Sequence, residues 1–151
     1  MTTPAENRLA AGIAADLLAA GSGIDAASRL VTAGALAAGL VAVPLAGEPW
    51  LLVALLPALA FGALEVVYAA RVALDAALFR RLSGDSPGDT PDLAAFDRAM
   101  GRLGLMPSDK AGRAMDARIA GAKRLLAIQA AAFAAQLALP LPVAALVVAV
   151  R

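Results

Sequence analysis

Residues 50–68 read WLLVALLPALAFGALEVVY, and this stretch decides the fold class of the chain. It carries a single charge, Glu65, and as an α-helix it spans about 27 Å at 1.5 Å per residue, close to the thickness of membrane hydrocarbon. Trp50 and Tyr68 would then lie at the two membrane interfaces, where aromatic residues gather. The stretch predicts a transmembrane helix in which Pro57 introduces a tolerable kink.

Two further stretches have the same character. Residues 26–46 carry one charge, Arg29, near their start, and residues 125–150 carry none. Hydrophobic residues make up 61% of the chain, well above the ~45–50% of soluble domains. We therefore predict an all-α membrane protein with three transmembrane helices at 26–46, 50–82 and 125–150, the second of which continues into the cytoplasm.

Polar residues and prolines interrupt the third predicted span. They are Gln129, Gln136, Pro140 and Pro142. Such residues are tolerated in lipid where they face other helices or the membrane interface. This helix is therefore expected to be kinked and partly packed against protein.

The first 25 residues predict a short amphipathic cytoplasmic helix. Thr3 provides an N-cap, with Pro4 at the first helical position and Glu6 three residues after the cap. Apolar residues then recur at four-residue spacing until a glycine pair ends the run: Leu9, Ile13 and Leu17, then Gly21 and Gly23. We expect this helix to pack on the bundle or to lie among lipid headgroups, with docking to a partner protein as the alternative.

A second capping pattern, formed by Ser22 and Asp25, predicts the start of the first span. Residues 47–49, with their Gly and Pro, predict a short external hairpin between the first two spans.

Residues 83–124 predict a cytoplasmic loop that contains short amphipathic helices. One of them has an apolar stripe formed by Leu93, Phe96, Met100 and Leu103, with Asp97, Arg98 and Arg102 outside it. Ser108 or Asp109 is expected to cap the next helix. The loop acids Asp85, Asp89 and Asp92 are too sparsely spaced for a calcium loop, and we interpret them as turn and cap residues.

The distribution of Lys and Arg predicts the orientation. Nine of these residues lie between Arg80 and Arg124, and none lies in the hairpin at 46–50. Because Lys and Arg accumulate in cytoplasmic loops, the 83–124 loop and the N-terminus should be cytoplasmic and the C-terminus external or periplasmic. The alanine-rich composition favours a bacterial inner membrane.

Missing residue types exclude several kinds of site. The chain has no Cys and no His, which excludes disulfides, thiolate catalysis, cysteine-ligated zinc or iron–sulfur sites and histidine-ligated haem. We expect no catalytic residues, no metal and no cofactor. The net charge is +1 with acids and bases interleaved, so no nucleic-acid partner is expected.

Glu65 is the strongest candidate for a functional residue, because an ionisable group inside a membrane span is costly. On a helix, Tyr68, Arg71 and Asp75 share its face, which predicts a polar surface for a proton relay or for the headgroup of a ligand. The alternative is a buried structural ion pair between Glu65 and Arg71 or Arg124.

These features favour a non-enzymatic subunit, or an accessory or assembly factor, of a membrane complex. Its partners would be the lipid bilayer and either other membrane subunits or further copies of itself. The alternative is a small proton or cation channel or transporter component that uses Glu65. A membrane-bound enzyme is the weakest hypothesis, since no acid–base or nucleophile–base pair can be identified.

Overall fold

The structure is a computed structural model that describes residues 3–46, 50–84, 93–104 and 111–140. These residues form helices and no β-strand, which confirms the predicted all-α class. The helices are α1 (Pro4–Ala19), α2 (Gly21–Ala46), α3 (Trp50–Ser83), α4 (Leu93–Arg102) and α5 (Met115–Ala138). The predictions for 47–49, 85–92, Ser108, Asp109 and 141–150 lie outside the described residues.

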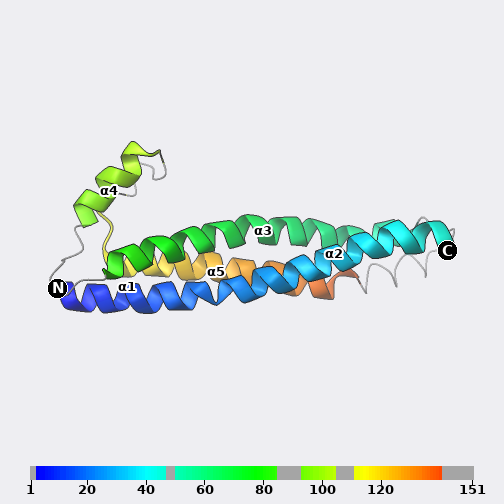
Figure 1. The fold of residues 1–151 in the computed structure, drawn as a ribbon, viewed down its shortest axis with the longest axis horizontal. Coiled ribbons are helices and arrows are strands. Elements are labelled where there is room, and N and C mark those ends of the chain that lie inside the picture. The colour runs from blue at the N-terminus through cyan, green and yellow to red at the C-terminus, as the bar shows by residue number, and fades with distance from the viewer. Residues whose placement is uncertain (1–2, 47–49, 85–92, 105–110, 141–151) are drawn as a thin grey trace.

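The long helices lie side by side in an elongated bundle. Helices α1 and α2 follow one another along its long axis, and α3 returns beside both (Figure 1). Helix α5 packs mainly against α3, whereas α4 projects from the end of the bundle where α1 begins (Figure 1). Helix α3 thus makes the most extensive contacts with the other long helices.

The beginning of α1 confirms the predicted cap. The Glu6 amide donates to Thr3 Oγ1 at 3.3 Å, and Glu6 Oε2 accepts from the Thr3 amide at 2.6 Å. Pro4 stands at the start of the helix, where a missing N–H costs nothing.

Helix α1 ends at Ala19, just before the glycines at which its end was predicted, but no loop follows it. Only Ala20 separates α1 from α2, which begins at Gly21. Ser22 does not cap α2, because its hydroxyl donates back to the Ala19 carbonyl at 2.7 Å. Gly21 instead allows the Gln129 side chain to approach the backbone of α2 closely, because a Cβ at Gly21 would lie only 2.9 Å from Gln129 Oε1.

Helix α1 packs on the bundle through its small residues. The core that it shares with α3 and α5 contains Ala11, Ala14, Ala15, Leu18, Val72, Ala76, Phe79, Leu82, Met115 and Ala122. The predicted stripe points outward, with Leu9 67%, Ile13 61% and Leu17 43% exposed. Alanines bring the backbones of two helices closer together than leucines do, so the alanine face is the one buried.

Two described stretches are long and apolar enough to cross a membrane: Ala5–Val41, which runs through α1 and α2, and Leu52–Ser83 of α3. Of the most apolar 18-residue segment in each stretch, only 6% and 28% is buried, respectively. A core helix of a soluble protein is mostly buried. Large apolar side chains such as Leu30, Leu40 and Leu45 are more than three-quarters exposed. Exposed apolar surface on this scale indicates an apolar environment.

The described residues do not show the third predicted span, residues 125–150. Helix α5 begins at Met115, and its first turns carry Asp116, Arg118, Lys123 and Arg124. The charge-free part of α5, residues 125–138, covers about 21 Å at 1.5 Å per residue, which is shorter than the ~30 Å of membrane hydrocarbon.

Helix α4 is attached through an ion pair that the sequence pattern missed. Asp97, predicted outside the apolar stripe, is 92% buried, and its two oxygens lie 2.8 and 2.9 Å from Arg118 Nη2. The Gly112 amide donates to the same carboxylate at 2.7 Å. Phe96 packs against the core as predicted, but Leu103 is 70% exposed.

Gly62 gives a test of how closely α2, α3 and α5 pack. A Cβ at Gly62 would collide with Thr32 Oγ1 and lie 2.8 Å from Gln136 Nε2. We predict that Gly62→Ala lowers the free energy of unfolding by about 1–3 kcal/mol, measured in detergent by the loss of helical circular dichroism during SDS titration.

Gly34→Ala is the matched control, because a Cβ at Gly34 meets nothing within 4 Å. Because alanine is favoured over glycine in a helix interior, this change should raise the free energy of unfolding by up to about 1 kcal/mol. Equal effects of the two substitutions would contradict the close approach at Gly62.

Candidate functional site

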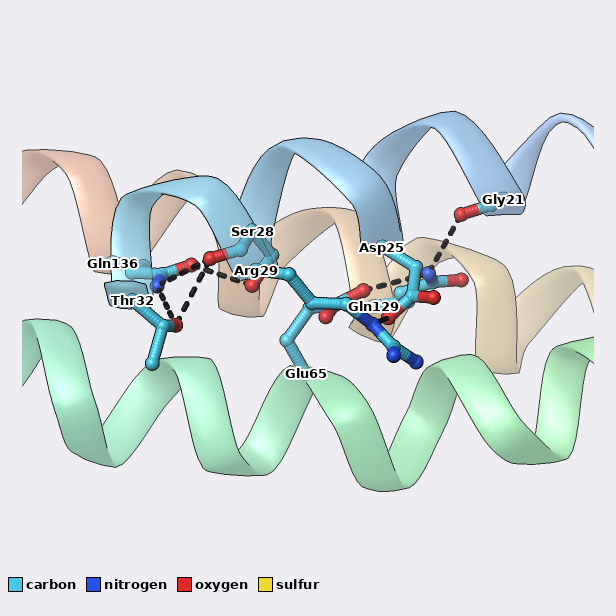
Figure 2. A network of polar contacts seen from close by, with 8 residues as sticks. All are labelled: Gly21, Asp25, Ser28, Arg29, Thr32, Glu65, Gln129 and Gln136. Carbon is cyan, nitrogen blue, oxygen red and sulfur yellow. Dashed lines mark hydrogen bonds and ion pairs between the residues drawn. The ribbon is translucent and has the colours of Figure 1, made fainter. Parts of the chain in front are cut away.

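Glu65 lies inside the bundle at a junction of three helices. Its side chain is fully buried, as is that of Gln129 from α5. Gln129 Nε2 donates to Glu65 Oε1 at 2.7 Å and to the Gly21 carbonyl of α2 at 2.9 Å (Figure 2). One amide group therefore ties α5 to both α3 and α2.

A second polar cluster lies further along the same helices. Gln136 Nε2 donates to Thr32 Oγ1 at 2.8 Å and to the Ser28 carbonyl at 3.2 Å, while Ser28 Oγ donates to Gln136 Oε1 at 2.7 Å (Figure 2). The Ser28 and Gln136 side chains are almost completely buried. All their polar atoms take part in this network, which buried groups require.

The two clusters repeat one contact. In each, a glutamine of α5 donates to a carbonyl of α2 that lies 108 residues earlier in the chain. Gln129 and Gln136 are seven residues apart, as are Gly21 and Ser28. Seven residues make two turns of a supercoiled helix. Helices α2 and α5 therefore present the same faces to one another at the Gln129–Gly21 contact and at the Gln136–Ser28 contact.

The Glu65 cluster differs from the second because two of its polar atoms have no partner. Glu65 Oε2 and Gln129 Oε1 are buried and accept no hydrogen bond from any residue that the structure describes. Leaving a buried acceptor unsatisfied costs about 1–3 kcal/mol.

The alternative that pairs Glu65 with Arg71 or Arg124 is wrong in the described structure. Both arginines are exposed, whereas Glu65 is buried and is bonded to Gln129. Arg29, on the helix beside Glu65, binds Asp25 at 2.8 Å, and its side chain is 65% exposed (Figure 2). The partner of Glu65 is thus a neutral amide.

The predicted polar face does not form one connected site. Tyr68 is half-buried, Arg71 is exposed and Asp75 is half-buried. Among the described residues, no hydrogen bond or ion pair joins these three to Glu65. Asp75 instead lines a separate cavity near α4.

That cavity has a volume of about 180 Å³ and lies between α3, α4 and α5. Its lining consists of Asp75, Leu78, Phe79, Leu82, Phe96, Met100 and Arg118. Burial raises the pKa of the Asp75 carboxyl, because the loss of water disfavours its charged form.

The described residues contain no group of three or more acidic, His or Cys side chains that could hold a metal ion. A carboxyl group and two amides inside an apolar bundle can fix the positions of helices and can hold a proton. The sequence predicted that Gln129 and Gln136 face other helices or the membrane interface, but it did not show that Gln129 is the partner of Glu65. Their seven-residue spacing is the signal that could have revealed this contact.

No family model matches the chain, and no curated protein or solved structure is significantly similar to it. The function must therefore be inferred from the features of the molecule itself. Three features are relevant: the polar clusters around Gln129 and Gln136, the exposed stripe of α1 and the cavity beside Asp75.

The Glu65–Gln129 contact predicts a specific order of stabilities. Gln129→Leu removes the donor to both Glu65 and Gly21 and should lower the free energy of unfolding by about 1–3 kcal/mol. Glu65→Gln keeps an acceptor for Gln129 Nε2 and replaces the buried ionisable group with a neutral amide, so its free energy of unfolding should equal or exceed that of the wild type.

Both variants are compared by SDS titration in the same detergent. If Glu65→Gln were as unstable as Gln129→Leu, the charge of Glu65 and not the shared hydrogen bond would hold the helices together.

Proposed function

We propose that this chain is a non-enzymatic subunit, or an accessory or assembly factor, of a membrane complex, and that it binds its partner through the exposed face of α1. The observation that carries the proposal is the exposure of Leu9, Ile13 and Leu17 on a helix whose opposite face is already packed against α3.

The lengths of the helices support a position of α1 outside the membrane. Helices α1 and α2 together extend for about 64 Å at 1.5 Å per residue, twice the ~30 Å of membrane hydrocarbon. The α1 end of the bundle carries the charges of Arg80, Arg81, Lys123 and Arg124, whereas residues 30–46 have none. In our proposal α2 and the first part of α3 cross the membrane and α1 extends into the cytoplasm.

The full proposed topology has three spans, with residues 125–150 as the third, in the inner membrane of a bacterium. It places the N-terminus and the 83–124 loop in the cytoplasm and the C-terminus outside. The excess of Lys and Arg between Arg80 and Arg124 supports this orientation.

The exposed face of α1 has a chemistry that suits a protein partner. Glu6 and Asp16 are exposed and project on the same side of the helix as Leu9, Ile13 and Leu17. Anionic lipid headgroups repel acidic side chains on this face. This repulsion disfavours an arrangement in which α1 lies among the headgroups. A partner helix with apolar residues flanked by Lys or Arg is complementary to it.

The proposal predicts that the partner is lost when the stripe is made polar. We expect tagged wild-type protein, extracted from its native membrane in mild detergent, to retain a stoichiometric partner. The triple variant Leu9→Ser, Ile13→Ser, Leu17→Ser should lose it, because the exposed leucines supply the apolar contact area. Mass spectrometry and size analysis measure both results.

Leu103→Ser is the control, since Leu103 is about as exposed as Leu9 but lies beyond α4. This variant should retain the partner. Recovery of wild-type monomer alone, or equal recovery of the partner by the triple variant, contradicts the proposal. The chain has no Cys, so Ile13→Cys introduces a single thiol. Labelling of this thiol reports whether α1 can be reached from the cytoplasm.

The second candidate function is a proton or cation carrier, which the unpartnered Glu65 Oε2 favours. A carboxyl group buried within a proposed membrane span suits such a role. This hypothesis predicts pH-dependent flux into vesicles reconstituted with the protein. Glu65→Gln should abolish that flux, and unchanged flux would eliminate the hypothesis.

A further inference from the structure

The cavity between α3, α4 and α5 has no role in the proposed function, because the exposed stripe of α1 does not line it. Its lining is mostly apolar and includes the rings of Phe79 and Phe96 and the thioether of Met100. Pockets of this kind, with one or two polar groups among apolar side chains, bind small molecules.

Asp75 is the polar group in this lining that is free to bind. It makes no hydrogen bond or ion pair with any residue that the structure describes. Asp97, the other acid in this region, differs, because Arg118 and the Gly112 amide occupy its oxygens. A carboxylate with reduced access to water is stabilised when a cation binds beside it.

Arg118 does not provide the cation that Asp75 lacks. Its Nη2 is 2.8 Å from Asp97 Oδ1, its Nε donates to the Arg113 carbonyl at 3.0 Å, and its guanidinium lies 5.8 Å from the centre of the Phe96 ring. Asp97 therefore balances the charge of Arg118. The net charge of Asp75, Asp97 and Arg118 together is −1, which favours a cationic ligand.

We propose that this cavity binds an organic ammonium ion, with the charged nitrogen at Asp75 and an apolar body between Phe79, Phe96 and Met100. The aromatic rings contribute through cation–π attraction as well as contact area. A volume of about 180 Å³ accommodates a fragment-sized ligand with one ring or a short alkyl chain. Charge and shape together distinguish this ligand from a neutral or anionic molecule of the same size.

Benzylammonium is a suitable probe, with benzyl alcohol and benzoate as neutral and anionic ligands of similar size. The full chain in detergent is labelled at the methionine methyl groups, and binding is followed by NMR. The Met100 signal reports on the cavity, and the signal of the buried Met115 reports on the core. Met100→Leu assigns the cavity signal.

We expect benzylammonium to shift the Met100 signal at saturable concentrations, with at least tenfold weaker binding by benzyl alcohol and benzoate. Asp75→Asn, which keeps the size of the side chain, should weaken benzylammonium binding at least tenfold. Asp116→Asn is the matched control, because Asp116 is an exposed acid on α5 that does not line the cavity, and this variant should bind benzylammonium like the wild type.

Equal binding of benzylammonium and benzyl alcohol would overturn the proposal, as would equal binding by Asp75→Asn and the wild type. Stronger binding of benzoate would assign the cavity to anions through Arg118 and would also overturn it. An unchanged Met115 signal in Asp75→Asn shows that loss of binding does not come from loss of the fold.

Discussion

The hydrogen bonds of Gln129 are the contact on which the arrangement of the long helices depends. Between apolar helices in lipid, burial of apolar surface gives little preference for one relative position over another. A buried amide does give such a preference, because its donors must meet acceptors at fixed points. Gln129 meets both Glu65 and Gly21, and so fixes α5 against α3 and α2 in a single contact.

Small residues make these short contacts possible. Gly21 and Gly62 lie where α2, α3 and α5 approach most closely, and a Cβ at either would meet a glutamine side chain. At the other end of the bundle, the alanines of α1 have the same effect against α3. The larger side chains are consequently left on the outer surface, where lipid or a partner can cover them.

The sequence predicted the features that depend on local chemistry. The cap at Thr3 and the long helix from Trp50 follow from capping geometry and hydropathy, and the cost of polar groups in lipid limited both glutamines to helix contacts or the membrane interface. The sequence did not predict the features that depend on a choice between faces or partners. Leucine spacing alone could not show that α1 buries its alanines, and Asp97 was counted as a surface acid because its partner, Arg118, lies on another helix.

The repeated contact between α5 and α2 also limits how α5 can be misplaced. Since Gln129 and Gln136 are one heptad apart, a slip of α5 by seven residues in one direction would bring Gln129 to the Ser28 carbonyl. That arrangement would withdraw the amide from Glu65 and leave a buried carboxyl group without a donor. Glu65 therefore distinguishes the observed register of α5 from a slip in that direction, because the slip would take the amide of Gln129 away from its carboxyl group.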